Sequence, residues 1–135
     1  MESDVGVVVP AYQPDVEVLL PYLDAIRDAV DPAVIRVELD APGEGVAEAI
    51  RKTGATVHVA DGRRGKGTAI THGFEALDTD VFAFADADGS TDAESFATVI
   101  AAVGDGTDVA VGSRRHPDAE VTDHQSRVRR RFGDW

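Results

Sequence analysis

The chain has 135 residues and a formal net charge of −12 at pH 7, and 43% of its residues are hydrophobic. This length fits one domain with a single core, and the absence of cysteine excludes disulfides and thiolate metal sites. The negative charge argues against a general nucleic-acid-binding protein, and no apolar run is long enough to cross a bilayer.

Acidic residues are spread along the whole chain, with 25 Asp and Glu against 13 Lys and Arg. Lysine is rare and occurs only at Lys52 and Lys66. A dispersed acidic surface with little lysine is typical of halophilic proteins, because high salt screens the repulsion between like charges. This feature concerns habitat rather than activity.

Short β-rich runs alternate with segments of helical periodicity. Strands are predicted, in chain order, at Val5–Pro10, Val34–Leu39, Ala55–Ala60, Asp80–Ala85 and Thr107–Gly112. Helices are predicted between them at Asp15–Val30, Gly45–Gly54, Gly67–Leu77 and Asp92–Val103. Pro21 is expected to bend the first helix or to mark its beginning. The alternation predicts an α/β fold with a mostly parallel sheet and helices on both faces.

The character of the chain changes after residue 115. Residues 1–115 are expected to form the core domain, whereas residues 116–135 form a polar, Arg-rich tail. We expect this tail to be helical from about Asp118 onward.

Polar clusters follow each predicted strand, and ligands of parallel sheets bind at the carboxyl ends of the strands. The clusters are PAYQPD, DAPGEG, DGRRGKG, DADGS and GSRR. Their shared placement indicates a ligand site along this edge, and it carries more weight than any one cluster.

Two carboxylates, Asp86 and Asp88, follow the apolar run VFAFA. If the strand continued through them, residues i and i+2 would point to one face and could together hold a hard divalent cation that also binds phosphate oxygens. The nearest basic residues in the sequence are Lys66 and Arg114, so these charges are either solvated or meant for an ion. A solvated turn with Asp as a helix cap is the alternative interpretation.

Basic residues lie in two of the clusters. The Gly-rich segment DGRRGKG carries Arg63, Arg64 and Lys66 at the start of a helix, where backbone N–H groups favour phosphate, although a solvated basic loop explains it equally well. Arg114 ends the last predicted strand, where a guanidinium suits phosphate or pairs with a surface acid.

A dinucleotide site is a weaker interpretation. The segment GEGVAE imitates the glycine fingerprint of such sites, but Glu48 stands at the third glycine position, where the helix must approach the strand closely. The histidines show no metal-ligand spacing, and His58 is expected to be structural.

Five motifs, taken in chain order, resemble the nucleotide-sugar half of family 2 inverting glycosyltransferases with the GT-A fold, a Rossmann-like α/β architecture. They are VVVPAYQPD, IRVELDAPGEGVAEAI, RGKGTAITHGFEAL, FADADGST and VGSRR. The pairing of GKGTAI with DADGST is most similar to the dolichyl-phosphate (polyprenyl-phosphate) glucosyl- and mannosyltransferase branch. The resemblance covers about residues 5–115. Family 2 catalytic domains continue beyond this length, so it implies a donor-binding part truncated before the acceptor half.

The resemblance assigns residues to the nucleotide sugar. Pro10, Ala11 and Tyr12 match the first-strand motif that walls the nucleotide base, and Asp15 stands for the acid that follows it. Asp40 matches the second member of the family's acidic pair, whose first member is replaced by leucine here. Lys66 is expected to contact the donor as well.

The resemblance also implies a metal and a phosphate site. Asp86 and Asp88 match the Asp-X-Asp motif, which implies Mg²⁺ or Mn²⁺ bridging the donor diphosphate, with Ser90 as a further ligand. Asp88 and Arg114 are expected to be catalytic, Arg114 by meeting phosphate. A second such arginine is expected in the tail, where Arg127 and Arg129 are the candidates.

The function implied is metal-dependent transfer of a hexose, from UDP-glucose rather than GDP-mannose, to a polyprenyl phosphate. The enzyme would be cytoplasmic, at the inner face of the cell membrane, with peripheral membrane contact through its C-terminal part. Two alternatives stay open: a family 2 transferase acting on a sugar hydroxyl in glycan or polysaccharide assembly, and a nucleotide-sugar-binding module without turnover.

Overall fold

The structure is a computed structural model that describes residues 4–103, 109–112 and 121–122. Strands within these ranges are β1 (Val5–Tyr12), β2 (Val34–Asp40), β3 (Thr56–Ala60), β4 (Val81–Ala85), β5 (Val109–Gly112) and β6 (Val121–Thr122). The helices are α1 (Val16–Val30), α2 (Val46–Arg51), α3 (Lys66–Ala76) and α4 (Ala93–Val103). The predicted strands and helices are therefore present, with ends that differ by a few residues.

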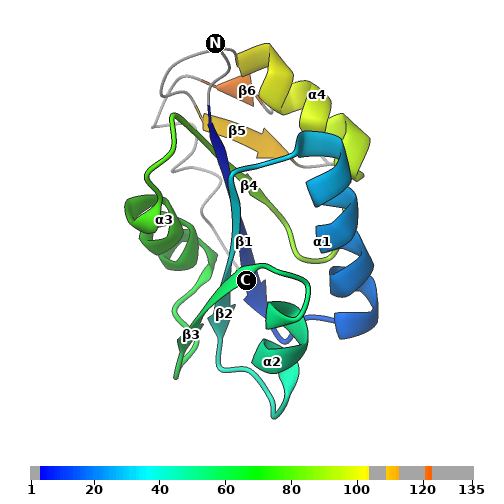
Figure 1. The fold of residues 1–135 in the computed structure, drawn as a ribbon. Helices are drawn as coiled ribbons and strands as arrows, with labels where there is room; N and C mark the ends of the chain where they lie inside the picture. The colour runs from blue at the N-terminus through cyan, green and yellow to red at the C-terminus, as the bar shows by residue number, and fades with distance from the viewer. Residues whose placement is uncertain (1–3, 104–108, 113–120, 123–135) are drawn as a thin grey trace.

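The strands form one sheet in the order β3-β2-β1-β4-β5-β6. All neighbouring pairs from β3 to β5 are parallel, which confirms the predicted α/β architecture. Helices lie on both faces of the sheet, with α3 on one side and α1, α2 and α4 on the other (Figure 1).

The tail contributes a strand where a helix was predicted. Val121 pairs with Ala110 and Thr122 with Val109, antiparallel to β5. The prediction of a helix from about Asp118 is therefore wrong at these two positions, because the edge of β5 offers backbone groups that a further strand pairs. The other tail residues lie outside the described ranges.

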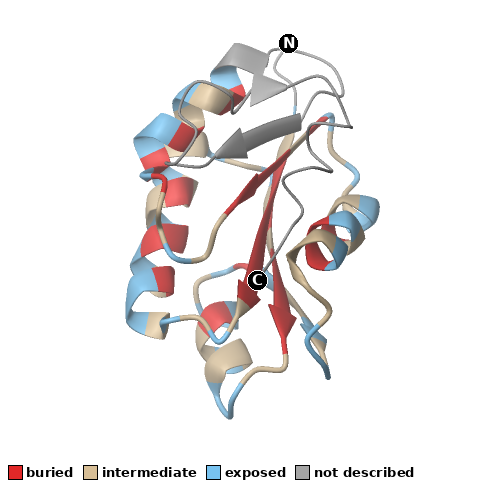
Figure 2. Cartoon of the chain, turned by 180° about the vertical axis from the view of Figure 1, so that it is seen from behind, coloured by how far each residue is buried: buried red, intermediate tan, exposed pale blue. Residues whose placement is uncertain are grey.

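The larger part of the core lies between the sheet and α1, α2 and α4. Buried side chains of β1 and β2 meet Leu23 and Ile26 of α1 and Phe96 of α4. Figure 2 shows buried positions along the central strands and on the sides of the helices that face the sheet. Helix α1 begins after Asp15, whose carboxylate accepts a hydrogen bond from the backbone N–H of Glu17. Pro21 lies inside this helix rather than at its start.

Among the described helices, α3 covers the other face of the sheet, and helix and sheet approach closely. Val8, Ile70 and Phe84 form a small apolar cluster there. A Cβ atom on Gly73 would lie 2.7 Å from a methyl carbon of Val8, so only glycine fits at this position of α3. This close approach fixes α3, and with it the start of the helix at Lys66, over the sheet.

Candidate functional site

Three segments that are far apart in the sequence meet around one cavity of about 550 Å³ at the carboxyl end of the sheet. The segments are the end of β1 with the following turn, the first residue of α3, and the turn after β4. Its lining consists of Pro10, Ala11, Tyr12, Gln13, Pro14, Asp15, Val18, Lys66, Asp86, Ala87 and Asp88. Seven of the donor and metal residues expected from the sequence are among them, namely Pro10, Ala11, Tyr12, Asp15, Lys66, Asp86 and Asp88.

The two carboxylates of the Asp-X-Asp motif lie in a turn. The sequence had suggested instead that they continue the strand and share one face. Strand β4 ends at Ala85, and the backbone N–H of Gly89 bonds to the carbonyl of Asp86 at 3.3 Å. The Oδ1 atom of Asp88 accepts the backbone N–H of Ser90 at 2.9 Å, which orients this carboxylate. Both carboxylates reach the cavity because the turn, rather than strand alternation, presents them.

Asp86 also has a basic partner that the local sequence did not reveal. The Nζ atom of Lys66 lies 2.8 Å from Oδ1 of Asp86, and both side chains are largely shielded from solvent. The same ammonium lies 5.9 Å from the ring centroid of Phe84. The fold therefore brings one cation onto the first carboxylate of the motif.

Tyr22 of α1 is bonded to the segment that follows this turn. Its hydroxyl donates a hydrogen bond to the backbone carbonyl of Thr91. Burial, together with the charges of Asp86, Asp88 and Asp92, raises the pKa of the Tyr22 phenol, so the phenol stays neutral. The bond from Tyr22 thus ties α1 to the segment that follows Asp86 and Asp88.

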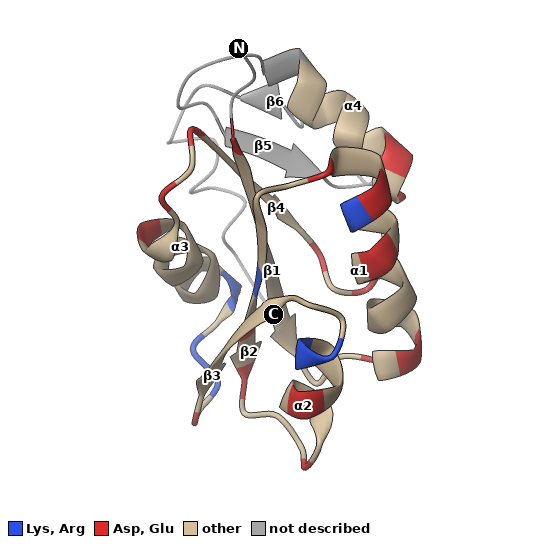
Figure 3. Cartoon of the chain, in the orientation of Figure 1, with Lys and Arg blue, Asp and Glu red and all other residues tan. Residues whose placement is uncertain are grey.

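The end of β1 forms another wall of the cavity. Tyr12 lines the cavity, and the guanidinium carbon of Arg63 lies 4.7 Å from the centroid of its ring. Asp15 is exposed and caps α1. Figure 3 shows basic residues on the segment that leads into α3, beside this edge of the sheet.

The model of the family described as Glycosyl transferase family 2 matches residues 7–133 of the chain. The chain belongs to glycosyltransferase family 2. No curated protein gives a match. Family membership confirms the family part of the resemblance, whereas the polyprenyl-phosphate branch stays a prediction.

Two solved structures resemble this family 2 domain. One is the mannosyltransferase PcManGT from Pyrobaculum calidifontis in complex with GDP-Man and Mn²⁺, with a TM-score of 0.63 and 21% identity over 74% of this chain. The other is glucosyl-3-phosphoglycerate synthase from Mycobacterium tuberculosis with Mn²⁺, UDP and phosphoglyceric acid, with a TM-score of 0.55 and 21% identity over 67% of this chain. The matches cover 32% and 34% of those proteins, so the domain spans about a third of their length.

Asp40 does not line the cavity of the family 2 domain. Its carboxylate is buried and accepts two hydrogen bonds from Arg64, one from the backbone N–H and one from Nε, each at 2.6 Å. Arg64 also donates from Nη1 to Glu38 at 2.9 Å. Asp40 therefore fixes the segment before α3 in this structure, and its expected contact with base or ribose stays a prediction.

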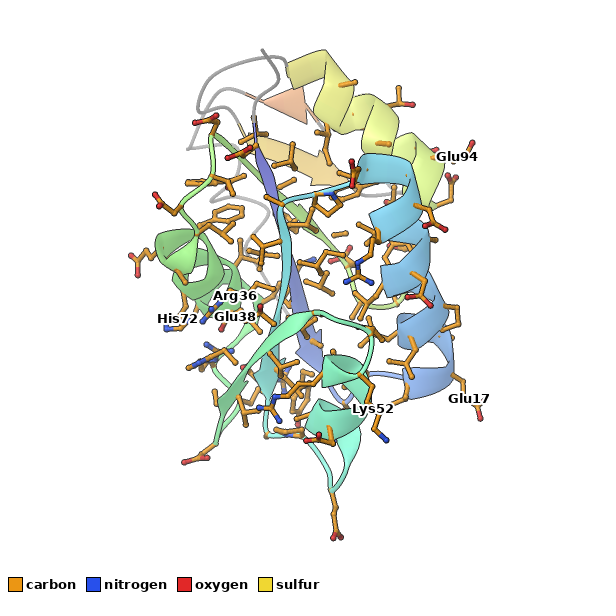
Figure 4. The ribbon with its side chains drawn as sticks, in the orientation of Figure 1. Glu17, Arg36, Glu38, Lys52, His72 and Glu94 are labelled. Carbon is orange, nitrogen blue, oxygen red and sulfur yellow. The ribbon has the colours of Figure 1, made fainter. Side chains whose placement is uncertain are left out.

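A second polar cluster lies under α3. Glu38 is buried, and Arg36 donates to it from Nε at 2.5 Å while Nδ1 of His72 lies 3.1 Å from both of its oxygens (Figure 4). Burial raises the pKa of Glu38, but hydrogen bonds from Arg36, Arg64 and His72 outweigh it and lower the pKa below its ordinary value. The sequence analysis missed this cluster, although alternation within β2 places Arg36 and Glu38 on one face.

Ligand atoms of Glu38, His58 and His72 lie within 4.8 Å of one another, a grouping that histidine spacing alone did not reveal. The ring centroids of His58 and His72 are 4.4 Å apart. Two guanidinium groups already bind Glu38, and they would repel a divalent cation placed on the same carboxylate. The cluster therefore holds α3 to β2, with the ring of His58 on β3 beside that of His72, and the structural role expected for His58 stays a prediction.

Ser90, expected as a further metal ligand, is not among the described residues that line the cavity. Ser90 lies beside the turn, and its backbone rather than its hydroxyl bonds to Asp88. Arg114 and the tail candidates Arg127 and Arg129 lie outside the described residues. None of the described helices is long and apolar enough to span a membrane.

Proposed function

We propose that this domain binds a nucleotide-sugar donor, and that it forms the donor half of an inverting hexosyltransferase. One observation carries the proposal: the wall formed by Pro10–Asp15, the lysine at the start of α3 and the Asp86–Asp88 turn meet around a single cavity. Its volume of about 550 Å³ falls within the usual range for a small-molecule site.

The donor set at the turn fits a hard divalent cation. Asp86 and Asp88 offer carboxylate oxygens, which Mg²⁺ and Mn²⁺ prefer, and both line the same cavity. Mn²⁺ in the two similar solved structures supports the same choice of ion. When bound, such a cation supplies Lewis-acid stabilisation of the diphosphate leaving group.

The remaining residues of the cavity bind and orient the donor. Tyr12 offers an aromatic face to the nucleotide base, next to the guanidinium of Arg63. Lys66 and the backbone N–H groups of the first turn of α3 offer positive charge to the diphosphate. The wall and the turn would thus hold the base and the diphosphate within one cavity.

The acceptor we favour is a polyprenyl phosphate at the cytoplasmic face of the membrane, with UDP-glucose as the donor. The support is the likeness of GKGTAI and DADGST to the dolichyl-phosphate branch. A phosphate monoester, with a second pKa of about 6, is already an anion near neutral pH and needs no general base. Arg114, together with Arg127 or Arg129, would orient that phosphate.

A second candidate is a donor-binding module without turnover. The observation that favours it is the lining of the cavity, which in the described part of the chain includes expected donor and metal residues but none assigned to the acceptor. A transferase that acts on a sugar hydroxyl would need a general base, unlike the favoured enzyme. Among the cavity residues, only the carboxylates already assigned above could act as that base.

Calorimetric titration of the 135-residue chain tests the proposal. UDP-glucose and GDP-mannose are titrated with and without Mn²⁺, and we expect Mn²⁺-dependent binding with UDP-glucose the tighter. Asp88→Asn should abolish the Mn²⁺ dependence, while Asp28→Ala, an exposed site on α1, should leave it unchanged. Equal affinity in wild type and Asp88→Asn would refute the assignment of the site.

A further inference from the structure

The ammonium of Lys66 lies against one of the two carboxylates proposed to hold the cation. The Nζ atom lies 2.8 Å from Oδ1 of Asp86, and the side chains of Lys66 and Asp86 are 20% and 23% exposed, respectively. Asp88 lines the same cavity and accepts a hydrogen bond from the backbone N–H of Ser90. A divalent ion and the ammonium therefore compete for one carboxylate.

We infer that Lys66 is an internal placeholder cation, displaced from Asp86 by the divalent ion and then bound by the donor diphosphate. This inference rests on the proposed function. In the metal-free state Lys66 neutralises Asp86 and lessens the repulsion between the two carboxylates of the turn. Because its stem begins at the first residue of α3, the freed ammonium stays beside the backbone N–H groups of that helix, where a phosphate binds.

The consequence is coupling between cation and donor. Breaking the Lys66–Asp86 pair costs free energy when the cation binds alone, and pairing the released ammonium with a diphosphate offsets that cost. Each ligand therefore raises the affinity of the site for the other by the same factor. Direct contact between the cation and the diphosphate also contributes to this coupling. The contribution of Lys66 is therefore measured as the decrease in coupling when Lys66 is replaced.

The chain offers a matched control, because its two lysines differ in setting. Lys52 is exposed and points away from the fold at the end of α2 (Figure 4). Lys66→Met and Lys52→Met thus remove the same charge from the same background, one inside the cavity and one outside it. Thermal unfolding of both variants checks that the fold is kept.

The experiment measures Mn²⁺ affinity by electron paramagnetic resonance, first alone and then with saturating UDP. Lys66→Met should bind Mn²⁺ alone about fivefold more tightly than wild type, the equivalent of one partly exposed ion pair. Saturating UDP should raise the Mn²⁺ affinity by a smaller factor in Lys66→Met than in wild type. Lys52→Met should match wild type in both measurements.

The outcomes separate this inference from the proposed function. If wild type binds Mn²⁺ and Asp88→Asn does not, the cation site stands; unchanged or weaker Mn²⁺ binding in Lys66→Met then overturns the placeholder role alone. If Asp88→Asn binds Mn²⁺ as wild type does, the cation site itself is wrong, and the inference is overturned with it.

Discussion

The hydroxyl of Tyr22 donates a hydrogen bond to the carbonyl of Thr91, which lies 69 residues further along the chain. This bond joins α1 to the segment that carries Asp86 and Asp88. Gly89, at φ 71°, lies over the same ring, and an added Cβ there would be 3.9 Å from Tyr22. The geometry of the acidic turn thus depends on a helix from the opposite end of the described sequence.

Tyr22→Phe tests that dependence. The substitution leaves the carbonyl of Thr91 without its donor, and the free energy of unfolding should fall by about 1–3 kcal/mol. Because the turn loses its support, Mn²⁺ affinity should fall as well. Urea unfolding and a Mn²⁺ titration of the same samples measure the two effects; full Mn²⁺ affinity in a destabilised variant would show that the bond supports the fold but not the turn.

The cluster under α3 predicts acid-sensitive stability. Glu38→Gln removes the charge that pairs with Arg36 and Arg64, and at neutral pH it should lower the free energy of unfolding by about 3 kcal/mol. The folded-state pKa of Glu38 is lowered from the ordinary 4.5, so its charge stabilises the fold above that pH. This stabilisation is lost as the pH falls through the lower folded-state pKa.

The difference between wild type and Glu38→Gln should therefore shrink below pH 4.5. Urea unfolding at a series of pH values measures it, with Glu75→Gln, an exposed site on α3, as the matched control. A difference that stays constant into acid would mean that the variant acts through packing rather than through charge.

Alternation of strands and helices was enough to predict the fold, because each β-rich run is followed by a segment with one apolar face. It was also enough to place Tyr12, Asp86 and Asp88 at one edge, since parallel strands end together. The sequence did not reveal the pairing of Lys66 with Asp86, because it depends on where α3 begins over the sheet.

The charged residues of β2 show a second feature that could not be predicted from the sequence. Arg36 and Glu38 lie two residues apart in a segment otherwise taken as an apolar strand, and period-two alternation places them on one side. Their partners Arg64 and His72 come from a loop and a helix, so no local pattern predicts which charges meet. For the same reason Asp40 was expected at the ligand, whereas Arg64 holds it here.

Gly73→Ala tests the close approach of α3. Alanine is the better helix former, but its Cβ would lie 2.7 Å and 2.8 Å from the methyl carbons of Val8 and 3.2 Å from Cγ of Glu38. Val8 is fully buried, so the helix must move, and we expect a loss of about 1–3 kcal/mol in the free energy of unfolding. Thermal unfolding measures it, and a stabilised variant would contradict the contact.

Tyr12 tests which wall of the cavity meets the nucleotide base. Stacking of a base on an aromatic side chain contributes about 1–3 kcal/mol, so Tyr12→Ala should weaken UDP and UDP-glucose alike, by about tenfold. Tyr12→Phe keeps the ring and should bind both nearly as wild type does. Calorimetry with Mn²⁺ present measures all three proteins.

The comparison of UDP with UDP-glucose is what decides the assignment. Tyr12 belongs to the wall formed by Pro10–Asp15, with the guanidinium of Arg63 against its ring, and Asp86 lies on the turn beside Lys66. In the proposed arrangement the base therefore meets the wall and the diphosphate meets the turn. If Tyr12→Ala weakened only the sugar conjugate, Tyr12 would face the hexose, and the donor would lie reversed between wall and turn. Equal weakening of both ligands places Tyr12 on the nucleotide, which the two ligands share, as the base assignment requires.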